Sequence, residues 1–158
     1  MKNTEPLPSD KVYPYTVRLL TGRDYTVAGI RKKLMLRQVA GQDIDDTILR
    51  LQREGWLDDQ RFAARFAESA RASGRYFGAR LRLEMRRRGF DADVVNEILA
   101  PLLTGSDENS EVRSAAERRS PGFSFSKANE RDKRRMIGFL QRRGFGLSAI
   151  VRALRSDE

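Results

Sequence analysis

The chain contains no cysteine and no histidine among its 158 residues. Without thiols or imidazoles it has no disulfide, no Cys/His zinc site, no thiol nucleophile and no histidine general base. No apolar run approaches the roughly 20 residues that span a bilayer. The N-terminal MKNTEPLPSDK also lacks the apolar core of a secretory signal. We therefore expect a cytoplasmic protein without a membrane segment.

Enzyme signatures are also missing, because the sequence has no P-loop, no GxGxxG and no nucleophile elbow. The acidic residues that begin several predicted helices, such as Asp43 and Asp91, are interpreted as helix caps rather than catalytic carboxylates. We therefore expect a protein that is not an enzyme and requires no metal or cofactor.

Positive charge, by contrast, is abundant. The 31 Lys and Arg residues outnumber the 22 Asp and Glu residues and give a net charge of +9. Such an excess attracts polyanions or acidic protein surfaces over long range. The competing interpretation is ordinary solubility charge on exposed helices.

One segment of the chain occurs twice. A shift of 55 positions places residues 81–99 on residues 136–154 with matching apolar and glycine positions. Each copy predicts a helix with apolar residues at i and i+4, a glycine that ends it, and a second amphipathic helix. We expect four residues to shape and pack these two corners: Gly89, Phe90, Gly144 and Phe145.

A weaker third copy precedes these two. A shift of 51 positions places Ile30 on Leu81 and Leu34 on Met85, with Gln38 and Val39 at the glycine-phenylalanine corner. Because another helix is predicted before each hairpin, the sequence predicts an all-α, elongated array of three tandem three-helix repeats. The competing interpretation is a compact bundle of the same helices.

The expected boundaries follow from composition and glycine stops. They are a flexible N-terminal tail at 1–13, three-helix repeats at 14–57, 58–103 and 111–158, and a linker at 104–110.

Helical geometry places much of the positive charge on one side of the predicted helices. With Leu81 and Met85 facing a core, arginines of the same helix fall on its opposite half, and the last repeat shows the same arrangement. In the first copy the equivalent outward position, Leu36, is apolar. The candidate partner-binding residues are Arg31, Lys32, Lys33, Arg80, Arg86, Arg87, Arg131, Arg135 and Arg142.

Two segments carry a family resemblance. LDDQRFA at 57–63, followed by Gly74 and the Gly89-Phe90 corner, resembles the central repeat of the RecX family of recombination regulators. FLQRRGF at 139–145 resembles that family's C-terminal repeat. The first repeat departs most, since Gly29-Ile30 and Val39-Ala40 replace an acidic-aliphatic pair and the usual glycine corner.

The resemblance implies a small helical protein that binds the RecA–DNA filament. It implies inhibition of filament extension, of ATP hydrolysis and of strand exchange, and hence a role in recombination and DNA repair. DNA would be contacted weakly or within the filament, and we expect a monomer. The competing hypotheses are a helical module that binds DNA or RNA directly without a recombinase, and a protein scaffold.

Overall fold

The computed structural model describes residues 5–104 and 107–156. Within these ranges the chain forms nine α-helices and no strand. The helices are α1 (Ser9–Gly22), α2 (Val27–Leu36), α3 (Gly41–Arg53), α4 (Asp59–Ala72), α5 (Gly78–Arg87), α6 (Ala92–Thr104), α7 (Glu108–Arg119), α8 (Glu130–Arg143) and α9 (Leu147–Arg155).

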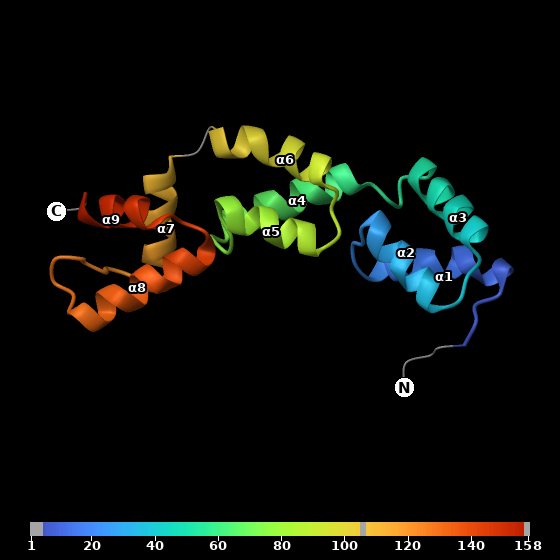
Figure 1. Ribbon diagram of the computed structural model, residues 1–158, viewed down its shortest axis with the longest axis horizontal. Coiled ribbons are helices and arrows are strands. Elements are labelled where there is room, and N and C mark those ends of the chain that lie inside the picture. The colour runs from blue at the N-terminus through green and yellow to red at the C-terminus, as the bar shows by residue number, and fades with distance from the viewer. Residues whose placement is uncertain (1–4, 105–106, 157–158) are drawn as a thin grey trace.

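The helices form three groups that lie in a row along the long axis of the molecule (Figure 1). The first repeat is α1–α3, the second is α4–α6 and the third is α7–α9. Each has its own core, with eight buried apolar side chains between Val12 and Leu57, eight between Ala63 and Leu99, and nine between Val112 and Leu154. The predicted fold class, an elongated all-α array of three-helix repeats, is confirmed, and the compact bundle is wrong.

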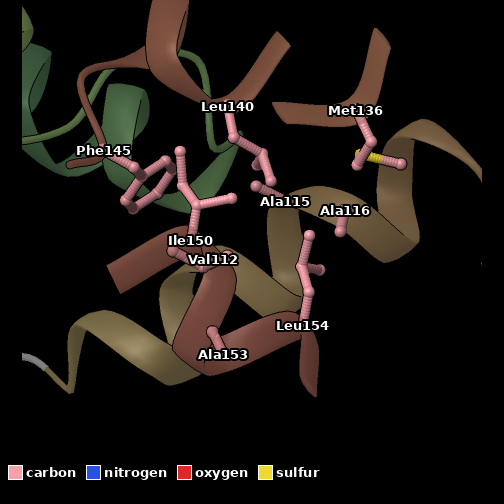
Figure 2. Packing of buried hydrophobic residues seen from close by; sticks show 9 residues of the cluster. All are labelled: Val112, Ala115, Ala116, Met136, Leu140, Phe145, Ile150, Ala153 and Leu154. Atoms are coloured by element: carbon pink, nitrogen blue, oxygen red, sulfur yellow. The ribbon is translucent and has the colours of Figure 1, made fainter. Parts of the chain in front are cut away.

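The third core shows how the three helices of one repeat pack together. Val112 of α7, Leu140 of α8 and Ile150 of α9 are fully buried and meet at its centre (Figure 2). Phe145, just after α8, packs beside Ile150. Each such side chain contributes about 1.5–3 kcal/mol by leaving water, so the three cores stabilise the array locally.

The helix corners have one backbone conformation in all three repeats. Gly89 and Gly144 have φ values of 91° and 107°, and Gln38 adopts φ 56° at the equivalent position of the first repeat. The next residue in each repeat donates its N–H to the carbonyl five residues earlier, as in Val39 to Leu34 at 3.2 Å. This is the bonding of a Schellman cap, so the first repeat keeps the corner without its glycine.

The N-terminal segment is more ordered than the predicted tail at 1–13. Helix α1 begins at Ser9, and Val12 is buried in the first core. Leu7 donates its N–H to the Arg37 carbonyl at 3.0 Å and packs against the same core. A tail over 5–13 is therefore wrong, because Leu7 and Val12 anchor this segment; residues 1–4 lie outside the described range.

The predicted linker at 104–110 is also too long. Thr104 still belongs to α6, and Glu108, Asn109 and Ser110 form the first turn of α7. Asp107 caps this helix by accepting the N–H of Asn109 at 3.1 Å. Capping overrides the loop-like composition, and residues 105–106 lie outside the described range.

Candidate partner-binding surface

The repeats are joined by two equivalent interfaces. At the first, between repeats 1 and 2, the Thr26 hydroxyl accepts the N–H of Gly29 at 2.9 Å and donates to the Arg88 carbonyl at 3.2 Å. A Cβ on Gly89 would lie 2.9 Å from the Thr26 oxygen. The Asp59 carboxylate adds a bond by accepting the Val27 N–H at 3.0 Å. The corner of one repeat therefore packs on the start of α2 in the repeat before it.

The second interface repeats this arrangement 51 to 55 positions later in the chain. The Phe77 N–H donates to the Arg143 carbonyl at 2.6 Å. The rings of Phe77 and Phe145 stack with centroids 4.6 Å apart. A Cβ on Gly144 would overlap the Phe77 carbonyl oxygen and lie 2.7 Å from the Arg80 Cβ. The corner glycines are thus contact points between repeats as well as helix stops.

Three arginines around α5 converge on one carboxylate. Glu84 forms ion pairs with Arg80 at 2.7 Å, Arg88 at 2.9 Å and Arg87 at 3.3 Å, and its side chain is only 10% exposed. We call these four residues the Glu84 cluster. Arg86 is engaged differently, since it donates to the Phe90 carbonyl at 2.6 Å. One negative charge is therefore shared by three arginines, so this helix stays net positive while these guanidinium groups are held by partners within the repeat.

The arginines of the Glu84 cluster lower the pKa of its carboxylate. The hydrogen bond from Arg88 holds the pKa of Glu84 below its ordinary value, aided by the charges of Arg80 and Arg87 and opposed by burial. The pKa of Asp59 is instead raised, because burial at the first interface disfavours its charged form and outweighs the hydrogen bond from the Val27 N–H. Glu84 is therefore ionised at neutral pH and pairs with the arginines around it.

The third repeat contains a groove instead. The loop at 120–128 folds beside α8 and leaves a concave space of about 930 Å³. We call it the third-repeat groove, and its charged lining is Arg119, Lys127, Asp132, Arg134, Arg135 and Arg142. Asp132 is 3.9 Å from Arg135, and the described residues offer no carboxylate partner to the other four cations. Positive charge is therefore concentrated and uncompensated here.

One substitution between repeats accounts for the part of this difference that lies on α8. A shift of 55 positions places Glu84 on Phe139, Arg80 on Arg135 and Arg87 on Arg142. Where the second repeat has a carboxylate, the third has an aromatic ring. The guanidiniums of Arg143 and Arg119 lie over Phe139 at 4.8 and 5.6 Å from its centroid. A ring holds cations near it without neutralising them.

The first repeat presents a third kind of surface. Arg31 pairs with Asp45 at 2.7 Å, and Lys33 lies over the Tyr25 ring at 5.5 Å. Lys32 is exposed. Leu36, at the position of Arg87, is 66% exposed, so this repeat combines exposed apolar side chains with its basic ones.

The candidate residues thus lie in different surroundings in the three repeats. Arg131, Arg135 and Arg142 are exposed on α8, and the last two line the third-repeat groove. Arg80 lies at the second interface and in the Glu84 cluster. Their binding roles remain predictions.

Sequence reasoning missed several members of these sites. Glu84 lies four residues from both Arg80 and Arg88, a spacing that signals helical ion pairs. Arg119 and Lys127 reach the groove only because the intervening loop folds back. No periodicity in the sequence indicates that fold.

The described residues lack two kinds of feature, a cluster of metal ligands and a membrane-spanning helix. They contain no group of three or more Asp or Glu side chains placed to hold a metal ion. In the same residues, no helix is both long and apolar enough to cross a membrane.

The fold and surface define a class: an all-helical tandem-repeat protein with clustered basic side chains on its surface. A family model described as RecX, second three-helix domain, matches residues 58–99. Regulatory protein RecX of Trichlorobacter lovleyi is 43% identical over 147 residues, covering 93% of this chain and 94% of the relative. Regulatory protein RecX of Syntrophotalea carbinolica is 28% identical, covering 96% and 98%. The chain belongs to the RecX family of regulatory proteins.

Solved structures show the same fold. The crystal structure of RecX from Lactobacillus salivarius superimposes with a TM-score of 0.74 at 16% identity, covering 94% of this chain and 95% of that one. Another crystal structure, of regulatory protein RecX, gives a TM-score of 0.69 at 18% identity, covering 95% and 72%.

Proposed function

We propose that this protein binds the RecA–DNA filament and inhibits its extension, its ATP hydrolysis and strand exchange, thereby modulating recombination and DNA repair. It acts as a monomer in the cytoplasm and performs no chemistry of its own. Family membership supports the regulatory role, and the family resemblance supplies RecA as the partner.

The observation that carries this proposal is the way the repeats are joined. Two equivalent corner interfaces hold three separate cores in an extended row (Figure 1). Repeat arrays of this kind use long concave surfaces to bind elongated partners. The net charge of +9 favours rapid association with a filament that contains DNA.

The first test is RecA ATP hydrolysis on single-stranded DNA with increasing amounts of this protein. We expect hydrolysis to fall as the protein approaches a stoichiometric ratio to RecA. Unchanged hydrolysis at that ratio would refute inhibition.

A charge-reversed variant tests the contact surface. Lys32→Glu/Arg131→Glu changes two exposed cations at opposite ends of the array for which the described residues provide no ion-pair partner. We expect weaker inhibition, with helicity by circular dichroism unchanged. Arg18→Glu/Arg53→Glu is the matched control, because it reverses two exposed cations of the first repeat that lie outside the candidate set. Equal inhibition by both variants would show that the contact surface is misassigned.

A second candidate function is direct DNA or RNA binding without a recombinase. The uncompensated cations of the third-repeat groove favour it. Tight nucleic-acid binding by the protein alone, combined with no effect on RecA, would support this function over the first.

A further inference from the structure

We propose that the third-repeat groove binds the phosphate backbone of single-stranded nucleic acid. This contact requires no second protein, so it does not rest on RecA binding. The nucleic acid contacts the loop at 120–128 and α8. The Glu84 cluster and the first repeat remain available to other partners.

The lining of the groove is strongly positive. Five cations line the groove and a single carboxylate, Asp132, lies among them. Arg119, Lys127, Arg134 and Arg142 have no carboxylate partner in the described residues. Guanidinium groups bind phosphate oxygens through paired hydrogen bonds, and a polyanion gains affinity by releasing its counterions at such a site.

Two arginines of α8 are spaced along the groove by several nucleotide steps. Arg134 and Arg142 both line the groove and are eight residues apart, which is about 12 Å along the helix axis. A single strand advances about 3.4 Å per nucleotide in B-form geometry. The two arginines therefore span about three to four nucleotides, and Arg119 at the end of α7 and Lys127 in the loop extend the basic lining beyond α8.

The aromatic lining selects a single strand. Phe123 is half-buried against the third core and also lines the groove in the loop; in the described residues no cation lies over its ring, unlike Phe125 and Phe139. Only an unpaired base can present its face to such a ring, and base stacking on aromatic side chains is a recurring mode of single-strand binding. An acidic peptide would satisfy the cations but would leave the ring unused.

Ser120 and Ser124 add hydroxyl donors to the lining of the groove. Hydroxyl groups commonly bind phosphate and sugar oxygens without reading sequence. The groove should therefore bind strands of any sequence.

The test is fluorescence anisotropy of a labelled oligo(dT) of about 20 nucleotides with the full chain alone, between about 50 and 200 mM salt. We expect binding that weakens steeply with salt and is tighter than binding to a duplex of the same length. Equal or tighter duplex binding would overturn the single-strand assignment.

Removing two groove cations should change that salt dependence. Arg134→Gln/Arg142→Gln should reduce the slope of log affinity against log salt by roughly 1.4, since each phosphate contact contributes about 0.7 for single strands. Affinity near 0.1 M salt should fall by roughly tenfold or more. Arg18→Gln/Arg53→Gln has the same change in net charge and should leave the slope nearly unchanged. Equal losses in both variants would show that binding follows net charge and not the groove.

Two further measurements make the result independent of α8. Lys127→Gln, an exposed loop substitution before α8, should reduce the slope by about 0.7. Phe123→Leu keeps an apolar side chain and should weaken oligo(dT) binding severalfold with little change in slope. Polyglutamate that displaces oligo(dT) at equal charge concentration would overturn the nucleic-acid assignment in favour of an acidic protein partner.

Discussion

The second and third repeats carry arginine at the same positions of the same helix but in opposite surroundings. In the second repeat, Arg80 and Arg87 pair with the nearly buried carboxylate of Glu84. In the third repeat their equivalents, Arg135 and Arg142, line an open groove, and Phe139 occupies the position of Glu84. Matching sequence positions therefore do not give matching surfaces.

The comparison shows which structural features the second and third repeats share. Corner geometry and the interface it forms are retained, because they depend on the backbone conformation at Gly89 and Gly144. The surroundings of the two equivalent arginines differ with their neighbours, since Glu84 lies beside them in one repeat and Phe139 takes its position in the other. Tandem duplication can thus preserve the architecture while each copy acquires a separate binding role.

The largest expected effect comes from the corner glycines. Gly144→Ala should destabilise the protein by about 3 kcal/mol, because φ 107° is unfavourable for alanine and its Cβ overlaps the Phe77 backbone. Gly89→Ala should cost less, about 1–2 kcal/mol, since φ 91° is strained for alanine but its Cβ would meet the side-chain oxygen of Thr26 rather than backbone.

Gly55→Ala is the matched control. Gly55 also has a positive φ, of 77°, but a Cβ there would meet nothing within 4 Å, so about 1 kcal/mol of backbone strain is expected. The free energies of unfolding of the three variants, measured with urea, should show the largest loss for Gly144→Ala and the smallest for Gly55→Ala. A Gly144→Ala cost no larger than that of Gly55→Ala would contradict a close interface between repeats 2 and 3.

A smaller effect should follow from transferring the second repeat's carboxylate to the third. Phe139→Glu should place a carboxylate beside Arg135 and Arg142 and neutralise part of the groove. Phe139→Gln loses the same ring without adding charge. We expect oligo(dT) affinity of the Glu variant to be about tenfold below that of the Gln variant at 0.1 M salt. Equal affinities would show that the Glu84 and Phe139 positions do not control the groove.

The smallest effect concerns Glu84 itself. Its pKa is below the ordinary value of about 4.5, so its ion pairs stabilise the fold above that pH and are lost as pH falls through the folded-state pKa. Glu84→Gln should cost about 1 kcal/mol at pH 7, a small value because the partner arginines are partly exposed. Thermal unfolding at pH 7 and below pH 4 should show this cost shrinking with acid; a constant difference would contradict ion pairing as its cause.

The sequence was sufficient for the architecture because repetition and apolar spacing are local signals. It even located the first corner, where Gln38 replaces glycine yet adopts the same left-handed conformation. It failed at the N-terminus, where prolines suggested a tail although Leu7 and Val12 contact the first core. The contacts of these two apolar side chains with the first core outweigh the proline content of the segment.

The binding surfaces were less accessible to sequence reasoning. Helical periodicity indicates which arginines face outward, but it does not indicate which carboxylate or ring lies beside them after folding. Arg80, expected on an open face, is 39% exposed and also lies beside Gly144 at the second interface. The third-repeat groove depends on the path of the loop at 120–128, which lacks any periodic pattern.

The most direct test of the proposed function is co-sedimentation with preassembled RecA filaments on single-stranded DNA, with DNA alone as the control. We predict that the protein will sediment with the filaments in an amount that exceeds its recovery with DNA alone, and that filaments imaged by electron microscopy will be shorter in its presence. Recovery equal to that with DNA alone, with filament lengths unchanged, would contradict the proposal that this protein regulates the recombinase filament.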